Sequence, residues 1–158
     1  MDSSFNPEQF LGAALTAPLV KRPPADAGRP YSATVQMPKV RPWSSDKGGE
    51  HRSGWAADIG LEIQLPPEVA SKVGQPKITL SDSVFLDTLP DGKGGYSLDM
   101  APGRNRGLRR YYDATGLNKP GTTMNHLAGQ LVKVVLKHEV AKDGSGDIYE
   151  RIDGITKA

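Results

Sequence analysis

Residues 57–65, Ala57-Asp58-Ile59-Gly60-Leu61-Glu62-Ile63-Gln64-Leu65, form the stretch of the chain that most clearly indicates a fold. Apolar residues alternate with polar or small ones throughout it, which is the pattern of a β-strand with one buried face. Pro66 and Pro67 follow directly and predict the end of the strand. A β-sheet is therefore the starting point for the rest of the chain.

The same alternation appears on both sides of this strand. Tyr31, Ala33, Val35 and Met37 alternate with polar residues, and the strand they predict ends at Trp43. Residues 44–54 are polar and Gly-rich, which predicts a loop. A helix is predicted between the cap Asn105 and the stop Gly116. Further strands are predicted over residues 78–86, 96–100 (after a hairpin tip at 91–95), 129–140 and 147–156.

The order of these elements predicts an all-β domain with one capping helix. Three long strands, a helix and two more strands follow the order of the OB-fold, a five-stranded Greek-key barrel. The helix is expected to close one end of the barrel with Leu108, Tyr111, Tyr112 and Thr115. We expect residues 31–158 to form this domain, preceded over residues 1–30 by a short helix beginning at Asn6 and a Pro-rich connector.

Composition narrows the possible functions. The chain has 158 residues, a net charge of +2 and no cysteine, so a disulfide scaffold and a thiolate metal site are excluded. We identify no signal peptide and no membrane-spanning run, and we expect a cytoplasmic protein. The histidines lack metal-ligand spacing, and neither a P-loop nor a nucleophile elbow is present. Neither an enzyme nor a cofactor-binding or metal-binding protein is predicted.

Three stretches carry a resemblance to a known family: Asp82-Ser83-Val84-Phe85-Leu86-Asp87, Gly103-Arg104-Asn105-Arg106-Gly107-Leu108 and Gly146-Asp147-Ile148-Tyr149-Glu150-Arg151-Ile152. From about residue 78 onward the chain resembles phage-encoded single-stranded-DNA-binding proteins of the OB-fold type. The resemblance implies coating of DNA during replication or recombination, in the cytoplasm of a host cell. Cellular bacterial relatives recruit partner enzymes through an acidic tail, which the closing residues 155–158 do not resemble.

The last two predicted strands carry the first group of candidate DNA-binding residues. If these strands pair, Lys133, Lys137, Tyr149 and Arg151 share one outer surface. Bases could then stack on the tyrosine while the cations follow phosphates. The alternative is a solvated sheet face with ordinary surface lysines.

A second group surrounds the first long loop and the third strand. Trp43 and Trp55 bracket the loop, which overhangs the binding groove in an OB-fold. Both rings could instead close the core, and the apolar alternation after Trp55 favours this for that residue. Phe85 lies opposite the apolar face of its strand, although a register error of one residue would reverse this. The cations of this group are Lys39, Arg41, Lys47 and Arg52.

Arg104 and Arg106 form the third group, at the start of the predicted helix. Cations there oppose the helix dipole, so their placement favours a bound phosphate. Salt bridges to Asp99 or Asp113 are the alternative reading.

Outward-facing Asp58 argues against a uniformly basic groove. The function predicted from sequence is single-stranded DNA binding with little sequence preference; a protein-interaction module and RNA binding remain alternatives.

Overall fold

The computed structural model describes residues 21–158, so the helix predicted to begin at Asn6 lies outside the described residues. Two α-helices are described, α2 (Pro67–Val73) and α3 (Arg106–Thr115), together with two 3-10 turns, η1 (Lys47–Gly49) and η2 (Met124–Leu127). The strands are β1 (Pro30–Val35), β2 (Lys39–Ser45), β3 (Arg52–Gln64), β4 (Lys77–Leu86), β5 (Thr88–Pro90), β6 (Tyr96–Leu98), β7 (Leu131–Val140) and β8 (Ile148–Lys157).

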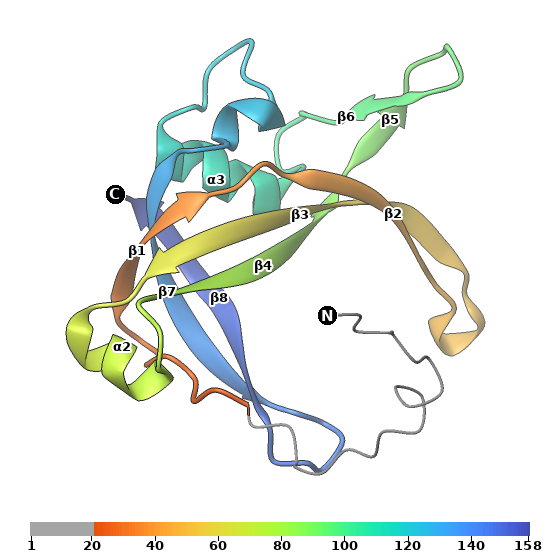
Figure 1. Cartoon of the computed structure of the whole chain (residues 1–158). Coiled ribbons are helices and arrows are strands. Elements are labelled where there is room, and N and C mark those ends of the chain that lie inside the picture. The colour runs from red at the N-terminus through yellow and green to blue at the C-terminus, as the bar shows by residue number, and fades with distance from the viewer. Residues whose placement is uncertain (1–20) are drawn as a thin grey trace, which may run out of the picture.

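One strongly bent antiparallel sheet makes up most of the molecule (Figure 1). Its strand order is β2-β3-β1-β7-β8, and β4 pairs with the other edge of β3. The long β3 strand organises this sheet. The first half of β3 pairs with β2, its second half pairs with β1, and β4 follows nearly its whole length. The predicted all-β class, with a helix between the third and fourth long strands, is confirmed.

The sheet remains open between β4 and β8. Strand β4 pairs only with β3 and β8 pairs only with β7, and within residues 21–158 no hydrogen-bonded ladder joins β4 to β8. A bulge interrupts the register of β7 and β8 between Val135 and Leu136. The closed barrel expected from the sequence is therefore replaced, in the described part of the chain, by an open sheet with a seam along β4 and β8.

The core lies inside the bend of the sheet. Ile59, Leu61 and Ile63 of β3 are fully buried there, as is Tyr111 of α3. The Tyr111 hydroxyl donates a hydrogen bond to Asp82 over 2.6 Å. Burial, reinforced by the Asp82 carboxylate, raises the pKa of Tyr111 far above its usual range. The predicted helix face is thus confirmed for Leu108, Tyr111 and Tyr112, whereas Thr115 is only partly buried.

Several predicted boundaries were wrong. The first strand breaks at residues 36–38, and Met37 is exposed instead of continuing the buried alternation. The loop predicted over residues 44–54 is shorter than expected and covers residues 46–51, because β2 continues to Ser45 and β3 begins at Arg52. The prolines after β3 begin a helix, α2, that was not predicted. Pro67 occupies its first turn, where the missing N–H costs nothing.

Asn105 is the N-cap residue of α3, but its side chain does not cap the helix. The residue is buried and left-handed, with φ of 51°. Its side-chain amide donates to the carbonyls of Asp87 and Asp99, and its side-chain oxygen accepts from the Asp87 N–H. Asn105 therefore ties the end of β4 and the chain after β6 to the start of the helix.

The described part of the predicted connector packs against the β7–β8 hairpin. Ala25 is fully buried, its N–H donates to Glu150, and its carbonyl lies 2.7 Å from His138 Nε2. Arg22 forms an ion pair with the same Glu150 carboxylate. The domain boundary at residue 30 stays a prediction, but residues 22–25 contact the sheet.

Candidate nucleic-acid interface

The outer face of β2, β3 and β4 carries a pair of aromatic rings, of which Phe85 is exposed and Trp43 is half-buried. Register places Arg41 of β2 and Phe85 of β4 on either side of Ala56, and places Trp43 opposite Gly54. The Trp43 and Phe85 rings meet edge to face, with centroids 5.1 Å apart, and Phe85 remains 68% exposed. These two rings, together with Arg41, Lys47 and Arg52, border a hollow of about 630 Å³; we call this group the aromatic platform.

Small residues of β3 provide the floor beneath the rings. A Cβ atom at Gly54 would lie 3.0 Å from Trp43 Nε1, so the indole rests directly on the strand. Ala56 is fully buried although it faces outward, because the neighbouring side chains cover it. The Trp43 N–H is buried with no partner among residues 21–158. An unsatisfied buried donor costs about 1–3 kcal/mol, so folding stability alone does not explain this position.

The charges of the platform are mixed. Arg41 Nε lies 2.7 Å from the Asp58 carboxylate, which also accepts a hydrogen bond from Ser83. These two donors hold the pKa of Asp58 below its usual range. Arg52 pairs with Glu50 at 3.0 Å. Lys39 and Lys47 are exposed and have no acidic partner among the described residues. The predicted cations surround the rings, but both arginines share their charge with carboxylates.

A second basic surface lies on the β7–β8 hairpin. Lys137 pairs with Arg151 across the ladder, and Glu139 pairs with Tyr149, so these four residues form what we call the hairpin face. The predicted alternation is confirmed, and exposed Lys133 lies farther along the same side of β7. Arg151 lies 5.5 Å from the centre of the Tyr149 ring. Lys137 and Arg151 both contact Glu139, a neutralising residue that the sequence reasoning overlooked.

The open seam connects the hairpin face to the aromatic platform. Ser81 and Ser83 of β4 and the residues Lys137, Glu139 and Arg151 line one hollow of about 420 Å³. Ser83 also lies 3.4 Å from the Arg41 guanidinium. A polar track therefore runs from the platform across the seam to the hairpin face.

The structure does not bring Arg104 and Arg106 to this surface. Gly107 of α3 packs against Val84, whose side chain faces away from that of Phe85. Arg104 lies 3.6 Å from Asp99, which is the salt bridge considered as the alternative. Arg106 is exposed. These two arginines lie behind β4, so they are not part of the aromatic platform.

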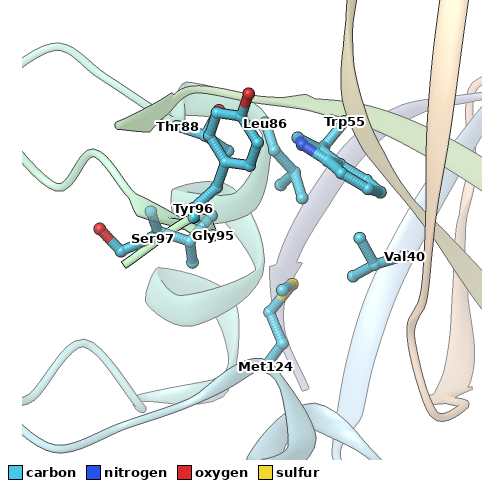
Figure 2. A pocket seen from close by; sticks show the side chains of 10 residues that line it. Val40, Trp55, Leu86, Thr88, Gly95, Tyr96, Ser97 and Met124 are labelled. Carbon is cyan, nitrogen blue, oxygen red and sulfur yellow. The ribbon is translucent and has the colours of Figure 1, made fainter. Parts of the chain in front are cut away.

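Trp55 faces the inner side of the sheet, as its apolar alternation indicated. Its ring lies 6.3 Å from that of Tyr96 in the β5–β6 hairpin. The two rings border a cavity of about 450 Å³ that is separate from the platform (Figure 2). Tyr96 was not predicted as a site residue. The sequence does show an aromatic residue directly after the Gly-rich hairpin tip. The strand that follows is too short for its alternation to predict whether the Tyr96 side chain is exposed.

Comparison with known proteins adds no relative: no protein-family model and no curated protein sequence matches the chain. Within residues 21–158, no helix has both the length and the apolar character needed to cross a membrane. In the same range, no group of three His, Cys, Asp or Glu side chains is placed to hold a metal ion. The function of the chain is therefore inferred from the aromatic platform and the hairpin face.

Proposed function

We propose that this chain binds single-stranded DNA through the aromatic platform, with little preference for sequence. The observation that carries the proposal is the contact between exposed Phe85 and half-buried Trp43 on a floor of small residues, bordered by Arg41, Lys47 and Arg52. Unpaired bases expose their flat faces and can stack on such rings, contributing about 1–3 kcal/mol per base. In duplex DNA those faces are already stacked within the helix.

The strand order supports assigning the domain to the OB-fold class. If β1 and β2 are counted as one interrupted strand, five long strands remain, with α3 between the third and the fourth. OB-folds bind oligonucleotides over the second and third strands and the adjacent loops. In this chain those strands are β3 and β4, and the first of the loops includes η1. The aromatic platform occupies that position.

The polar track gives the phosphates a path. Neutralising phosphates with lysine and arginine releases counterions, so affinity should fall steeply with added salt. Lys39, Lys47 and Lys133 are placed to do this, whereas Lys137 and Arg151 would first have to leave Glu139. Arg41 and Arg52 can contribute only by exchanging a carboxylate partner for a phosphate. This mode of binding suits the coating of single strands during phage replication or recombination.

Fluorescence anisotropy with labelled oligo-dT and a duplex of equal length tests the proposal, at about 50 and about 200 mM salt. We expect strong binding to the single strand, weak binding to the duplex and a steep loss of affinity at the higher salt. An oligo-U of the same length separates DNA binding from RNA binding. Absence of binding to every strand at low salt would overturn the proposal and leave protein interaction as the function of this face.

A further inference from the structure

We infer that the cavity between Trp55 and Tyr96 is a second stacking site, which takes one base of the strand held by the aromatic platform. The inference rests on the proposed function and adds a place where the strand leaves the outer face of the sheet. Its occupant is a single neutral nucleobase. Its position is the gap between the main sheet and the β5–β6 hairpin.

The walls of this cavity have the chemistry that a base requires. Val40, Leu86 and Met124 supply apolar surface, while Trp55 and Tyr96 supply rings (Figure 2). Thr88, Gly95 and Ser97 also line the cavity. The volume of about 450 Å³ falls in the range of about 300–1,000 Å³ typical of small-ligand sites.

The cavity adjoins the aromatic platform through a third hollow. A smaller hollow of about 310 Å³ lies where β5 diverges from β3, and Gly54, Trp43 and Thr88 line it. It shares Trp43 with the platform, and it shares Trp55, Thr88 and Tyr96 with the cavity. A chain of adjoining hollows therefore leads from the Phe85–Trp43 pair around the sheet to the Trp55–Tyr96 pair.

The absence of charge in the lining selects the part of the nucleotide that enters. No lysine, arginine, aspartate or glutamate lines the cavity as described, whereas cations surround the platform. A phosphate would lose its hydration there without gaining a partner, so it must stay outside. A base carries no charge, so it can leave water for the apolar walls and the two rings. The adjoining hollows that lead from the platform to the cavity favour this occupant over an apolar side chain from another protein.

Two single-tryptophan variants provide the test, because the chain has only two tryptophans. Trp43→Phe leaves Trp55 as the sole reporter of the cavity, and Trp55→Phe leaves Trp43 as the reporter of the platform. We expect oligo-dT to quench the tryptophan emission of both variants. An oligonucleotide with one abasic position, moved stepwise along the strand, should restore Trp55 emission at a position different from the one that restores Trp43 emission.

Tyr96→Ala supplies an affinity measurement that does not depend on fluorescence. Tyr96 is 61% exposed, so the domain should fold without its ring, and we expect oligo-dT binding to weaken about tenfold. Leu89→Ala is the matched control. Leu89 is an exposed apolar residue of the same hairpin that does not line the cavity, and its removal should leave affinity unchanged.

The outcomes separate the two proposals. Quenching of Trp43 without quenching of Trp55, together with full affinity in Tyr96→Ala, would overturn the second site and leave the platform intact. The second site would also be overturned if oligo-dT quenched Trp55 but no single abasic position restored the Trp55 emission. In that case the group that enters the cavity would not be a base. Failure of the unaltered chain to bind oligo-dT by anisotropy would overturn both proposals.

Discussion

The two faces of β3 differ in the size of the side chains that they carry. On the inner face Ile59, Leu61 and Ile63 are fully buried in the core. On the outer face Gly54, Ala56 and Gly60 add almost no side-chain volume, and the space above them holds Trp43, Phe85 and Gln36. One face of the strand therefore stabilises the fold, and the other leaves room for rings that remain accessible to a ligand.

This difference shows that stability and recognition are separable in the same strand. A change on the inner face should lower the free energy of unfolding without altering the affinity of the molecules that remain folded. A change to an exposed ring on the outer face should lower affinity with little effect on the free energy of unfolding. The separation is weakest at the start of β3, where Trp55 belongs to the inner face but borders an open cavity.

Ile59→Ala should have the largest effect and should act on stability. Ile59 is fully buried, and removing such a side chain typically costs about 2–5 kcal/mol through lost burial and the cavity left behind. Urea denaturation followed by circular dichroism measures the loss. Ser81→Ala, on the exposed outer face of β4, is the control and should change stability by less than about 0.5 kcal/mol. Equal losses in both variants would contradict the division between the faces.

Phe85→Ala should have the next largest effect and should act on binding. Loss of one stacked base at about 1–3 kcal/mol corresponds to an oligo-dT affinity reduced about fivefold to more than a hundredfold. Stability should change by no more than about 1 kcal/mol, because mainly the edge contact with Trp43 is lost. Anisotropy and urea denaturation measured on the same sample distinguish the two. An unfolded variant would show that Phe85 belongs to the core.

Gly54→Ala and Gly60→Ala form a matched pair, each adding one methyl group to the outer face of β3. At Gly54 the new Cβ would press on the Trp43 indole, whereas at Gly60 it would meet the flexible end of Gln36. We expect Gly54→Ala to weaken oligo-dT binding several-fold and Gly60→Ala to leave it unchanged. Loss of glycine favours the strand by up to about 1 kcal/mol at each position, but displacing the Trp43 indole or the Gln36 amide offsets this gain. Equal affinities would show that the position of the indole does not matter for binding.

Asp58→Asn should have the smallest effect, in the opposite direction. It frees Arg41 and removes a charge that repels phosphate, so affinity should rise, by at most about fivefold.

The depressed pKa of Asp58 stabilises the native state above pH of about 4, and that contribution disappears as pH falls through the lowered pKa. The stability difference between the unaltered chain and the variant should therefore shrink in acid. A difference independent of pH would mean that the ion pair with Arg41 does not stabilise the fold.

Periodicity made much of the sheet predictable from sequence. The alternation of residues 57–65 located β3, and the positions of Ile78, Val84 and Phe85 placed the phenylalanine on the opposite face from the apolar residues of β4. The same local rule could not show that the sheet stays open, because the distance between β4 and β8 depends on long-range packing. It also could not find α2, since two consecutive prolines mark a break equally well whether a loop or a helix follows.

The candidate site was predictable only as a set of residue types. Trp43 and Phe85 were identified from exposure arguments, but their contact depends on three strands being in register. Arg104 was assigned to phosphate because the partner Asp99 could not be placed from sequence. Tyr96 was missed because its neighbour Trp55 is distant along the chain and becomes close only through the fold.

The most direct test of the central claim is the oligo-dT affinity of the Trp43→Ala, Phe85→Ala double variant, measured by anisotropy at low salt beside the unaltered chain. The account predicts a loss of about a hundredfold or more in a variant that still unfolds cooperatively in urea, because the outer face of β3 would lose both of its rings. A double variant that folds and binds oligo-dT as tightly as the unaltered chain would contradict the account.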